Sequence, residues 1–411
     1  MPPIEIVTFE RSSDLFPAWF RTRGFVYFQP RPDDERVELF RKHMTAGRFV
    51  AAVDDGTVVG TYRSWTTHVT APGGATVAAD AVSSVAVLPT HRRRGLLTRM
   101  ITEDLGLAVE QGLPLAVLIA AEAPIYGRYG FGAATETARW VVDARTARIA
   151  ASARRSAGTV RLVDEGELRG LAPAVHELAR RPGEIDRPAA WWDRDFGFVL
   201  AEPSRVPRSA AVHVAPDGTV DGFVTFRAED VWHDRVYDSV LHVEMFRAAS
   251  DDAYAGLWSL LLDVDTVARV EAEELAVDEP LPWFLTDPRA ARQVSRVDFQ
   301  WSRLLDPAAV LSARGYEAPG AVVVEVVDPA GWAAGTYLLE ADASGAGSCT
   351  RTSRSAELTL GVGVLSCAWL GSNTLPAASA AGLVDEHVPG ALGRLARLLV
   401  TSRAPWTPTW F

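Results

Sequence analysis

The stretch "SSVAVLPTHRRRGLLTRM" at residues 83–100 determines the expected fold of this 411-residue chain. An apolar, strand-like run comes first, and Pro89 ends its hydrogen-bonding ladder because proline has no backbone N–H. Three arginines and Gly95 follow, and behind them apolar residues recur at three- and four-residue spacing, which predicts a helix with one buried face. The predicted order is therefore strand, basic turn, glycine and amphipathic helix.

A helix that begins at this turn presents unpaired backbone N–H groups and the positive end of its dipole. Gly95 permits a ligand to approach the backbone closely, and Arg92, Arg93 and Arg94 supply bidentate donors suited to phosphate. The alternative is an exposed basic turn without a ligand. The succession of strand, turn, glycine and helix favours an anion-binding site.

Composition and charge exclude several classes of protein. Hydrophobic residues make up 48% and charged residues 23% of the chain, as in ordinary globular proteins, and the length predicts two or three domains. The net charge of −11 argues against nucleic acid as a partner and suits a small cationic molecule. Because no apolar run would span a bilayer and no signal core is present, we expect a cytoplasmic protein with no membrane partner.

Other site chemistries find no support in the residue spacing. Cys349 and Cys367 have neither the number nor the spacing of a disulfide framework or a zinc site, so we expect them to be reduced and buried. The eight histidines show no metal-ligand spacing, and we therefore predict no metal. No G-x-S-x-G or H-E-x-x-H motif is present, and Lys42, the only lysine, does not lie in a Walker A motif.

One pattern occurs twice in the chain. Residues 49–65 and 210–227 each contain a strand, an Asp-Gly turn and a second strand, which is a strong hairpin signal. Further strands and a helix follow in both cases, so we predict one domain type used twice. The second junction has no arginines, and there we expect Asp251 and Asp252 to cap the helix. Only the first copy should therefore bind an anion.

Two further stretches indicate boundaries between domains. Residues 142–161, rich in Ala, Arg and Ser, are predicted to be a linker or an exposed helix, and the proline-containing residues 277–293 mark a second boundary. Beyond it, several strands and a final helix at 391–402 predict a small α+β domain.

The first junction also matches a known motif. Arg92-x-x-Gly95-x-Leu97 resembles the acetyl-CoA motif of the GNAT superfamily of N-acetyltransferases, Arg/Gln-x-x-Gly-x-Gly/Ala, with Leu97 in place of the usual small residue. Together with "IYGRYGFG" at residues 125–132 and a chain that ends in Phe411, the junction is similar to the Eis-like family of aminoglycoside and lysine N-acetyltransferases. The resemblance extends along the whole chain.

The resemblance implies a mixed α/β fold, of the α+β class, with two tandem GNAT domains and a small sterol-carrier-like domain. The expected boundaries are residues 1–145 for a GNAT domain with the acetyl-CoA site, 146–285 for a central GNAT-like domain without one, and 286–411 for the sterol-carrier-like domain. The terminal carboxylate is expected to enter the active site of the first domain. The relatives imply a homohexamer.

Carried over residue by residue, the resemblance implies how acetyl-CoA binds as a co-substrate. In such a fold the two central strands splay apart and leave edges with which the amide-rich cofactor can pair. The strand takes the pantetheine arm, the basic loop wraps the pyrophosphate, and two residues flank the end of the neighbouring strand. The residues implied for the pantetheine arm are Val85, Ala86 and Val87. Those of the basic loop are Arg92, Arg93, Arg94, Gly95, Leu96, Leu97 and Thr98, and those at the end of the neighbouring strand are Ala121 and Glu122.

The resemblance assigns the general acid to Tyr126 and the base to the terminal carboxylate of Phe411. A phenol with an ordinary pKa of about 10 stays protonated at neutral pH and can donate toward a thiolate whose parent thiol has a pKa of about 8.5. From the residues alone, packing is the commoner role for a tyrosine in such a turn, and Tyr129 is a second candidate. A terminal carboxyl, with an ordinary pKa of about 3.5, is a weak base, so its other possible role is to orient the ammonium and a relaying water.

The family's acceptors are cationic amines. We therefore expect acetyl transfer by direct attack of a primary amine of an aminoglycoside, a polyamine or a lysine-like acceptor, with specificity determined by residues 24–40. Within them, Asp33, Asp34 and Glu35 either attract polyamines or form a solvated helix start. Trp410 occupies a position at which some relatives have an acidic residue. A more apolar amine is therefore an alternative acceptor. The alternative is a non-catalytic CoA-sensing or lipid-carrier protein.

Overall fold

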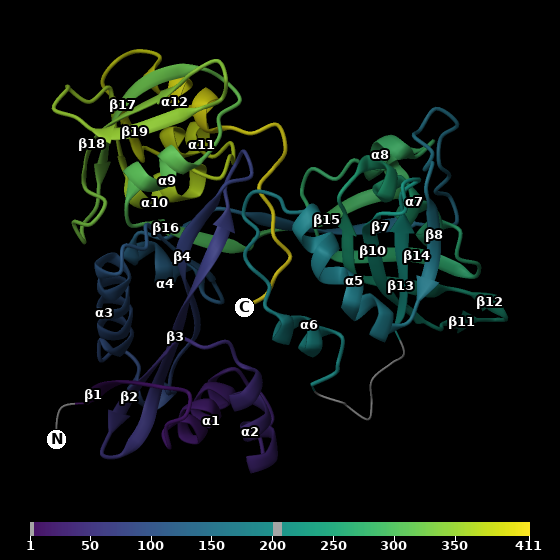
Figure 1. Ribbon diagram of the computed structural model, residues 1–411, viewed down its shortest axis with the longest axis horizontal. Helices are drawn as coiled ribbons and strands as arrows, with labels where there is room; N and C mark the ends of the chain where they lie inside the picture. The colour runs from purple at the N-terminus through teal and green to yellow at the C-terminus, as the bar shows by residue number, and fades with distance from the viewer. Residues whose placement is uncertain (1–3, 200–207) are drawn as a thin grey trace. The chain divides into compact units, whose positions relative to one another are not determined.

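The computed structural model describes residues 4–199 and 208–411, which form two compact units. Unit 1 comprises residues 1–135, 299–405 and 409–411, and unit 2 comprises residues 136–298 and 406–408. Each unit contains a seven-stranded sheet with helices packed on it, and unit 1 also contains a five-stranded sheet (Figure 1). The mixture of helices and sheets confirms the predicted α+β class. The predicted domain boundaries stay predictions.

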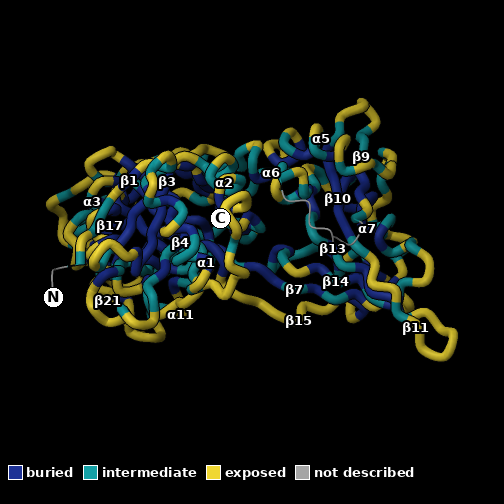
Figure 2. Tube along the Cα trace, turned by 90° about the horizontal axis from the view of Figure 1, so that it is seen from below, coloured by how far each residue is buried: buried dark blue, intermediate teal, exposed yellow. Residues whose placement is uncertain are grey.

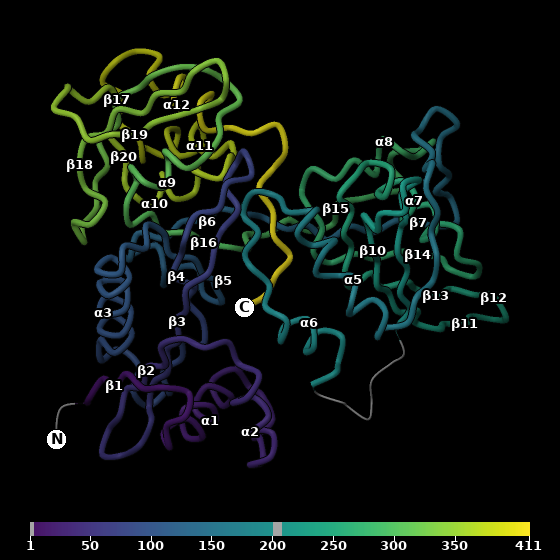
Figure 3. The backbone as a smooth tube through the Cα atoms, in the orientation of Figure 1, coloured from purple at the N-terminus to yellow at the C-terminus, as the bar shows by residue number. Residues whose placement is uncertain are grey.

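The first sheet lies in unit 1 and has the strand order β1-β2-β3-β4-β5-β16-β6. Strands β1 to β4 form an antiparallel meander, β4 and β5 are parallel, and β16 pairs with both β5 and β6 (Figure 3). The strands are β1 (Glu5–Phe9), β2 (Arg48–Asp54), β3 (Thr57–Thr70), β4 (Thr76–Val87), β5 (Leu115–Ile119), β16 (Gln300–Leu304) and β6 (Gly132–Ala133).

Side chains that alternate between the two faces of this sheet contribute to two separate hydrophobic cores. On β2, Phe49 packs with the aromatic residues of helix α1, whereas the next residue, Val50, packs with the apolar face of helix α3. Since successive strand residues point to opposite faces, α1 and α3 cover opposite faces of the sheet. The helices of this part are α1 (Phe16–Val26), α2 (Asp34–His43), α3 (Leu96–Glu110) and α4 (Ala123–Tyr126), with the 3-10 turns η1 (Pro89–His91) and η2 (Gly127–Tyr129).

The second sheet, in unit 2, repeats the order of the first five strands of the first sheet. Its order is β15-β7-β14-β13-β10-β9-β8, and β13 and β14 form its parallel pair. Both Asp-Gly pairs lie in tight turns between paired strands, as predicted. The strands are β8 (Thr159–Val163), β9 (Ser209–Val214), β10 (Val220–Glu229), β13 (Ser239–Ala248), β14 (Val267–Leu275), β7 (Glu136–Asp143) and β15 (Ala291–Asp298). The repeat expected from the sequence is therefore present as two sheets whose first five strands follow the same order, with the fourth and fifth parallel.

The described part of unit 2 also contains four helices and a small hairpin. The hairpin of β11 (Trp232–His233) and β12 (Val236–Tyr237) is exposed, whereas the central strands of the sheet are buried (Figure 2). Residues 144–158 form turns and loops within unit 2, so the exposed helix given as one alternative there is not observed, and a linker between domains stays a prediction. The helices are α5 (Glu165–Leu178), α6 (Ala189–Asp195), α7 (Asp251–Leu262) and α8 (Leu281–Phe284), followed by η3 (Pro288–Ala290).

The third sheet, in unit 1, is the predicted small α+β part of the chain. Its order is β19-β18-β17-β20-β21. The predicted final helix is observed as α12 and ends at Leu399. Within the described chain, no helix combines the length and the apolar character needed to cross a membrane. The elements are α9 (Pro307–Ala313), β17 (Gly320–Val327), β18 (Gly335–Ala341), β19 (Gly347–Arg351), β20 (Leu358–Gly361), α10 (Val362–Ala368), α11 (Leu375–Ala380), β21 (Val384–Glu386) and α12 (Ala391–Leu399).

Candidate active site

The first sheet opens between its two central parallel strands. Pairing of β4 with β5 ends at Val82 and Leu118 among the described residues, although β4 continues to Val87. Ser84 has a positive φ of 55° and lies in a bulge against β3, where its carbonyl accepts a hydrogen bond of 2.8 Å from the Thr61 hydroxyl. The bulge bends β4 at the point where the strands separate. The end of β4 therefore presents an unpaired edge on its β5 side.

The start of α3, at Leu96, lies nine residues after the end of β4 at Val87 and has the geometry of an anion site. Gly95 adopts the left-handed conformation, with φ 74°. Arg93 also adopts it, with φ 65°. The first backbone bond of the helix runs from the Arg99 N–H to the Gly95 carbonyl at 3.0 Å. The preceding N–H groups therefore have no partner inside the helix. They belong to Leu96, Leu97 and Thr98.

The arginines of the loop are exposed and only loosely paired. Arg92 lies 3.5 Å from Glu122 at the end of β5, and both side chains are more than half exposed. Arg94 lies 3.9 Å from Asp54, which also contacts His91 at 3.0 Å. Exposed ion pairs of this length contribute little to stability. The guanidinium groups are therefore available to an anionic ligand at little cost.

Helix α3 is fixed to the sheet by a buried polar cluster. The Asp104 carboxylate on α3 accepts hydrogen bonds from Arg48 Nε at 2.7 Å, from the Tyr62 hydroxyl at 2.9 Å and from the Ser64 hydroxyl at 2.7 Å. Arg48 also donates to Asp80 at 2.8 Å, and burial together with the nearby Asp104 raises the pKa of Asp80. This cluster sets the rotation and height of α3, and with them the position of the basic loop.

Tyr126 and Tyr129, the two tyrosines of the turn after β5, have different surroundings. Tyr126 is 6% exposed, packs edge-on against Phe131 and makes no hydrogen bond through its hydroxyl within the described chain. Burial, with a smaller contribution from Tyr27, raises its pKa above the ordinary value. The Tyr129 hydroxyl is instead engaged by the Thr98 hydroxyl of α3 at 2.8 Å. Of these two tyrosines, Tyr126 is therefore the one whose hydroxyl has no hydrogen-bond partner among the described residues.

Tyr27 is a site residue that the sequence interpretation did not single out. Its hydroxyl donates to the carbonyl of Val85, on the unpaired end of β4, at 2.9 Å, and the Arg23 guanidinium lies 5.6 Å from its ring centroid. Its neighbours Phe25 and Phe28 are 64% and 96% exposed. The signal available in the sequence was this cluster of aromatic residues in the segment expected to select the acceptor.

The acidic run in the same segment forms the start of helix α2. Asp33 is the N-cap and accepts a hydrogen bond of 2.8 Å from the Arg36 N–H, and Asp34 pairs with Arg21. Acidic residues in a first turn stabilise a helix through its dipole. The solvated helix start expected for Asp33, Asp34 and Glu35 is observed, and attraction of polyamines by these carboxylates stays a prediction.

The end of the chain is docked rather than loose. The Phe411 ring packs edge-on against Trp65 of β3, with a centroid distance of 5.8 Å, and Trp410 packs against Phe299 at 4.9 Å. All four residues belong to unit 1. In the part of the chain that the structure describes, no hydrogen bond, ion pair or ring contact joins Phe411 to Tyr126.

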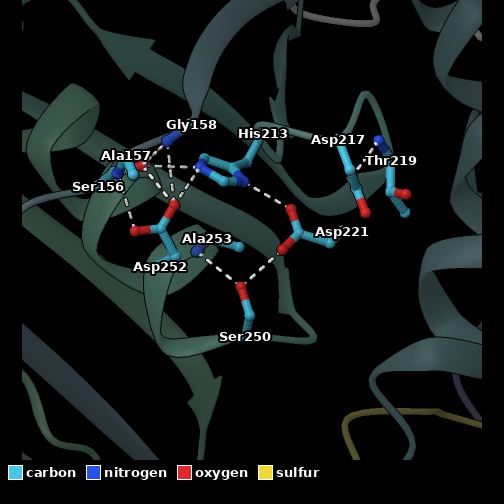
Figure 4. Close-up of polar contacts among 10 residues, drawn as sticks. All are labelled: Ser156, Ala157, Gly158, His213, Asp217, Thr219, Asp221, Ser250, Asp252 and Ala253. Carbon is cyan, nitrogen blue, oxygen red and sulfur yellow. Dashed lines mark hydrogen bonds and ion pairs between the residues drawn. The ribbon is translucent and has the colours of Figure 1, made fainter.

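The corresponding junction of the second sheet is occupied by the chain's own side chains (Figure 4). Ser250 is the N-cap of α7 and accepts a hydrogen bond of 3.0 Å from the Ala253 N–H. The prediction that Asp251 and Asp252 cap this helix is therefore wrong, because Ser250 directly precedes the first helical turn and they lie within it. Asp252 instead accepts hydrogen bonds from the N–H groups of residues 157–158 at 2.9 and 3.1 Å.

A serine, a histidine and an aspartate meet at this second junction without forming a nucleophile. His213 contacts Asp221 at 2.5 Å through Nδ1 and Ser156 at 2.8 Å through Nε2. The Ser156 hydroxyl, however, donates to Asp252 at 3.0 Å, and Asp252 also lies 3.3 Å from Nε2 of the same ring. The ring is therefore not arranged to take the serine proton, as a hydrolytic triad requires. Among the described residues no cluster of His, Cys, Asp and Glu could hold a metal ion.

An opened pair of parallel strands, a glycine-preceded helix with free N–H groups and a buried tyrosine in the following turn form the arrangement that the resemblance to GNAT acetyltransferases led us to expect for an acetyl-CoA site. Comparison with known families agrees. The family described as an acetyltransferase (GNAT) domain matches residues 10–134, a second family of the same description matches residues 183–315, and a sterol carrier protein domain matches residues 307–408.

Individual relatives cover nearly the whole chain. An N-acetyltransferase from Streptomyces avermitilis, described as uncharacterized, is 39% identical over 400 residues, or 96% of each chain. N-acetyltransferase Eis of Mycobacterium tuberculosis is 35% identical over 336 residues, which covers 80% of this chain and 79% of the relative. The crystal structure of Eis1 from Mycobacterium abscessus superposes with a TM-score of 0.87 and 31% identity, over 99% of this chain and 100% of that one.

The chain belongs to the Eis-like N-acetyltransferases, with two GNAT domains and a C-terminal domain of the sterol carrier protein type. The family resemblance seen in the sequence and the predicted tandem fold are confirmed. The protein is accordingly an acetyltransferase, and the alternative of a non-catalytic carrier or sensor is not retained.

Proposed function

We propose that acetyl-CoA binds in unit 1, with its pantetheine arm along the unpaired end of β4 and its pyrophosphate at the start of α3. The observation that carries this proposal is the separation of β4 from β5 beyond Val82, on the strand that leads to a helix, α3, whose first N–H groups are unpaired. The residues proposed to contact acetyl-CoA are Val85, Ala86, Val87, Arg92, Arg93, Arg94, Gly95, Leu96, Leu97, Thr98, Ala121 and Glu122.

The proposed reaction is direct attack. The neutral amine nitrogen of the acceptor forms a bond with the thioester carbonyl carbon, the carbon–sulfur bond breaks, and the CoA thiolate leaves while the nitrogen loses a proton. Tyr126 donates its hydroxyl proton toward the developing thiolate. Because burial raises the pKa of Tyr126, donation of a hydrogen bond is more favourable than complete transfer of the proton.

The terminal carboxylate of Phe411 is the proposed partner of the acceptor ammonium. Docking of the Phe411 ring on Trp65 holds this carboxylate on the body of unit 1, which a frayed terminus would not achieve. A carboxylate with an ordinary pKa of about 3.5 stays ionised at neutral pH. Its proposed role is to orient the amine and to receive its proton directly or through a water.

The proposed acceptor is a cationic molecule with a primary amine, such as an aminoglycoside, a polyamine or a lysine-like amine. The net charge of −11 favours the approach of cations. The exposed rings of Phe25 and Phe28, near Tyr27, favour an acceptor that also has apolar surface. A homohexamer is proposed from the family resemblance alone, and a cytoplasmic location from the lack of an apolar run in the sequence that would span a bilayer.

In the central GNAT domain, we propose that no acetyl-CoA binds. Asp251 and Asp252 lie in the first turn of α7, where their negative charge would repel a pyrophosphate. Ser250 already accepts the Ala253 N–H that an anion would need.

The proposed function is tested by measuring thiol release from acetyl-CoA with a panel of amines that ranges from polyamines and aminoglycosides to arylalkylamines. Wild-type protein should release thiol in proportion to the acetylated amine, identified by mass spectrometry. Deletion of Phe411 should lower kcat by about a hundred-fold, because the carboxylate moves by one residue. Phe411→Ala, which keeps a carboxylate at position 411, is the matched control and should lose less. Wild-type rates in the deletion variant would refute the role given to the terminus.

A further inference from the structure

Arg303 of β16 is buried directly behind the turn that carries Tyr126. Its side chain is 0% exposed, and its Nε donates a hydrogen bond of 2.8 Å to the carbonyl of Tyr129. The next residue, Gly130, adopts φ 81°, and a Cβ atom there would lie 2.6 Å from the same Nε. The absence of a side chain at Gly130 is what allows the guanidinium to reach the turn.

The remaining donors of Arg303 are also paired. Its Nη1 donates to the carbonyl of Leu304, and its Nη2 contacts both carboxylate oxygens of Asp328 at 2.7 Å. Asp328 is itself held by the N–H groups of Ala330 at 3.1 Å and Ala333 at 2.9 Å. The Asp328 carboxylate therefore fixes the guanidinium, and the guanidinium holds the turn through its hydrogen bond to the Tyr129 carbonyl.

The turn has few constraints of its own. Helix α4 is only four residues long, and the turn is closed by the Gly130 N–H to the Gly127 carbonyl at 3.0 Å and by a longer bond of 3.3 Å from the Phe131 N–H to the Tyr126 carbonyl. Short helical turns of this kind are not stable by themselves. The side chain of Tyr129 is held by the Thr98 hydroxyl, but holding the Tyr126 ring in one orientation also requires an anchor for the backbone of the turn.

We propose that Arg303, held by Asp328, is a positioning residue for acetyl transfer, which fixes the turn so that the Tyr126 hydroxyl faces the reacting thioester. The inference rests on the proposed role of Tyr126. It gives the C-terminal part of unit 1 a function in the chemistry that is separate from supplying the terminal carboxylate. All the residues involved belong to unit 1.

The first experiment compares Arg303→Lys with Arg314→Lys. Arg314 is another fully buried arginine of unit 1, and it donates to the carbonyls of Trp369 and Leu399, far in sequence from the tyrosine turn. A lysine keeps the charge but cannot reproduce the fork of the guanidinium. We expect both variants to lower Tm, but only Arg303→Lys to lower kcat, by about ten-fold or more, with KM for acetyl-CoA changed less than about two-fold.

The second experiment places Arg303→Lys in a Tyr126→Phe background. If Arg303 acts through Tyr126, its effect on kcat should largely disappear there, since the group that it positions is gone. An unchanged kcat in Arg303→Lys, or the same fold-loss in both backgrounds, would overturn the inference. If Tyr126→Phe alone keeps the wild-type kcat, the proposed acid is wrong, which is a separate failure.

Asp328→Asn provides the same test if Arg303→Lys does not fold. It leaves the arginine in place, keeps the shape of the carboxylate and loosens the guanidinium. We expect the same pattern of a lower kcat with a nearly constant KM for acetyl-CoA. A variant that folds and retains wild-type kcat would count against the positioning role.

Discussion

Gly95 meets two requirements at the first residue before α3. Its φ of 74° lies in the left-handed region, where a side chain costs roughly 1 kcal/mol or more. An added Cβ there would meet no atom within 4 Å, so the requirement for glycine is one of backbone conformation and not of packing. The open space is also where the proposed pyrophosphate would approach. Stability and ligand access therefore depend on the same residue for different reasons.

Gly95→Ala should lower the free energy of unfolding by about 1 kcal/mol and raise KM for acetyl-CoA, since the methyl group would lie on the ligand side of the helix start. Gly106→Ala is the matched control, because Gly106 lies within the same helix and an added Cβ would also meet no atom within 4 Å. That variant should gain about 0.5 to 1 kcal/mol and leave KM unchanged. Urea unfolding and steady-state kinetics measure both effects. Equal stabilities for the two variants would contradict the conformational argument.

The features of the fold and of the candidate site that could be predicted from the sequence are those formed by residues close together in the chain. The Asp-Gly turns and the strand, basic loop and helix around Gly95 depend on neighbouring residues, and all were predicted. The contact of Arg303 with the Tyr129 carbonyl spans 174 positions of the chain, and that of Tyr27 with Val85 spans 58. No periodicity or spacing rule covers such distances. Those two residues could be recognised only once the fold brought their partners together.

Helix α3 is fixed to the sheet by contacts at its middle, whereas the proposed anion site lies at its first residues. Asp104 lies about two turns behind the basic loop and collects three hydrogen bonds from β2 and β3. Its side chain is 2% exposed, so none of these bonds is replaced by water if it is lost. The geometry of the proposed anion site therefore depends on a carboxylate that does not touch the ligand.

Asp104→Asn should lower the free energy of unfolding by about 3 kcal/mol, because it leaves the Arg48 charge with a weaker buried partner. The variant should also raise KM for acetyl-CoA, as α3 loses its fixed rotation. Glu103→Gln is the control: the neighbouring residue is exposed on the same helix and should change stability by less than about 0.5 kcal/mol. Chemical unfolding with parallel kinetics measures both. A stable Asp104→Asn with wild-type KM would show that the cluster does not position the helix.

The two seven-stranded sheets share the order of their first five strands but differ in the residues of the junction between their fourth strand and the following helix. In both, the first five strands follow the same order and the fourth and fifth are parallel. In the second sheet the pairing ends at Val243, although β13 continues to Ala248, so this pair of strands also opens. The copies differ in the residues of the junction, which are arginines and a glycine in one and Ser250 with two aspartates in the other. The two copies therefore differ in the charge and polar groups of the junction, and not in the order of their first five strands.

Unit 2 contains a buried group that makes its stability depend on pH. His176 on α5 is 1% exposed, and its Nδ1 lies 3.3 Å from a guanidinium nitrogen of Arg247, which pairs with Glu184 at 2.6 Å. Burial, followed by the charge of Arg247, lowers the pKa of His176 to about 2. The folded unit therefore keeps this imidazole neutral at pH values at which the unfolded chain binds a proton.

The sign of the effect follows from that difference. Since the unfolded His176 has an ordinary pKa of about 6.5, its contribution to stability is complete above that pH and is lost as the pH falls toward 2. Between pH 7 and 5.5 the loss should reach about 1 kcal/mol. In His176→Gln, which keeps an acceptor for Arg247 but cannot be protonated, that part of the pH dependence should be absent. Urea unfolding followed by circular dichroism at both pH values measures the difference between the two proteins. The same loss in the variant as in the wild type would assign the acid sensitivity to another group.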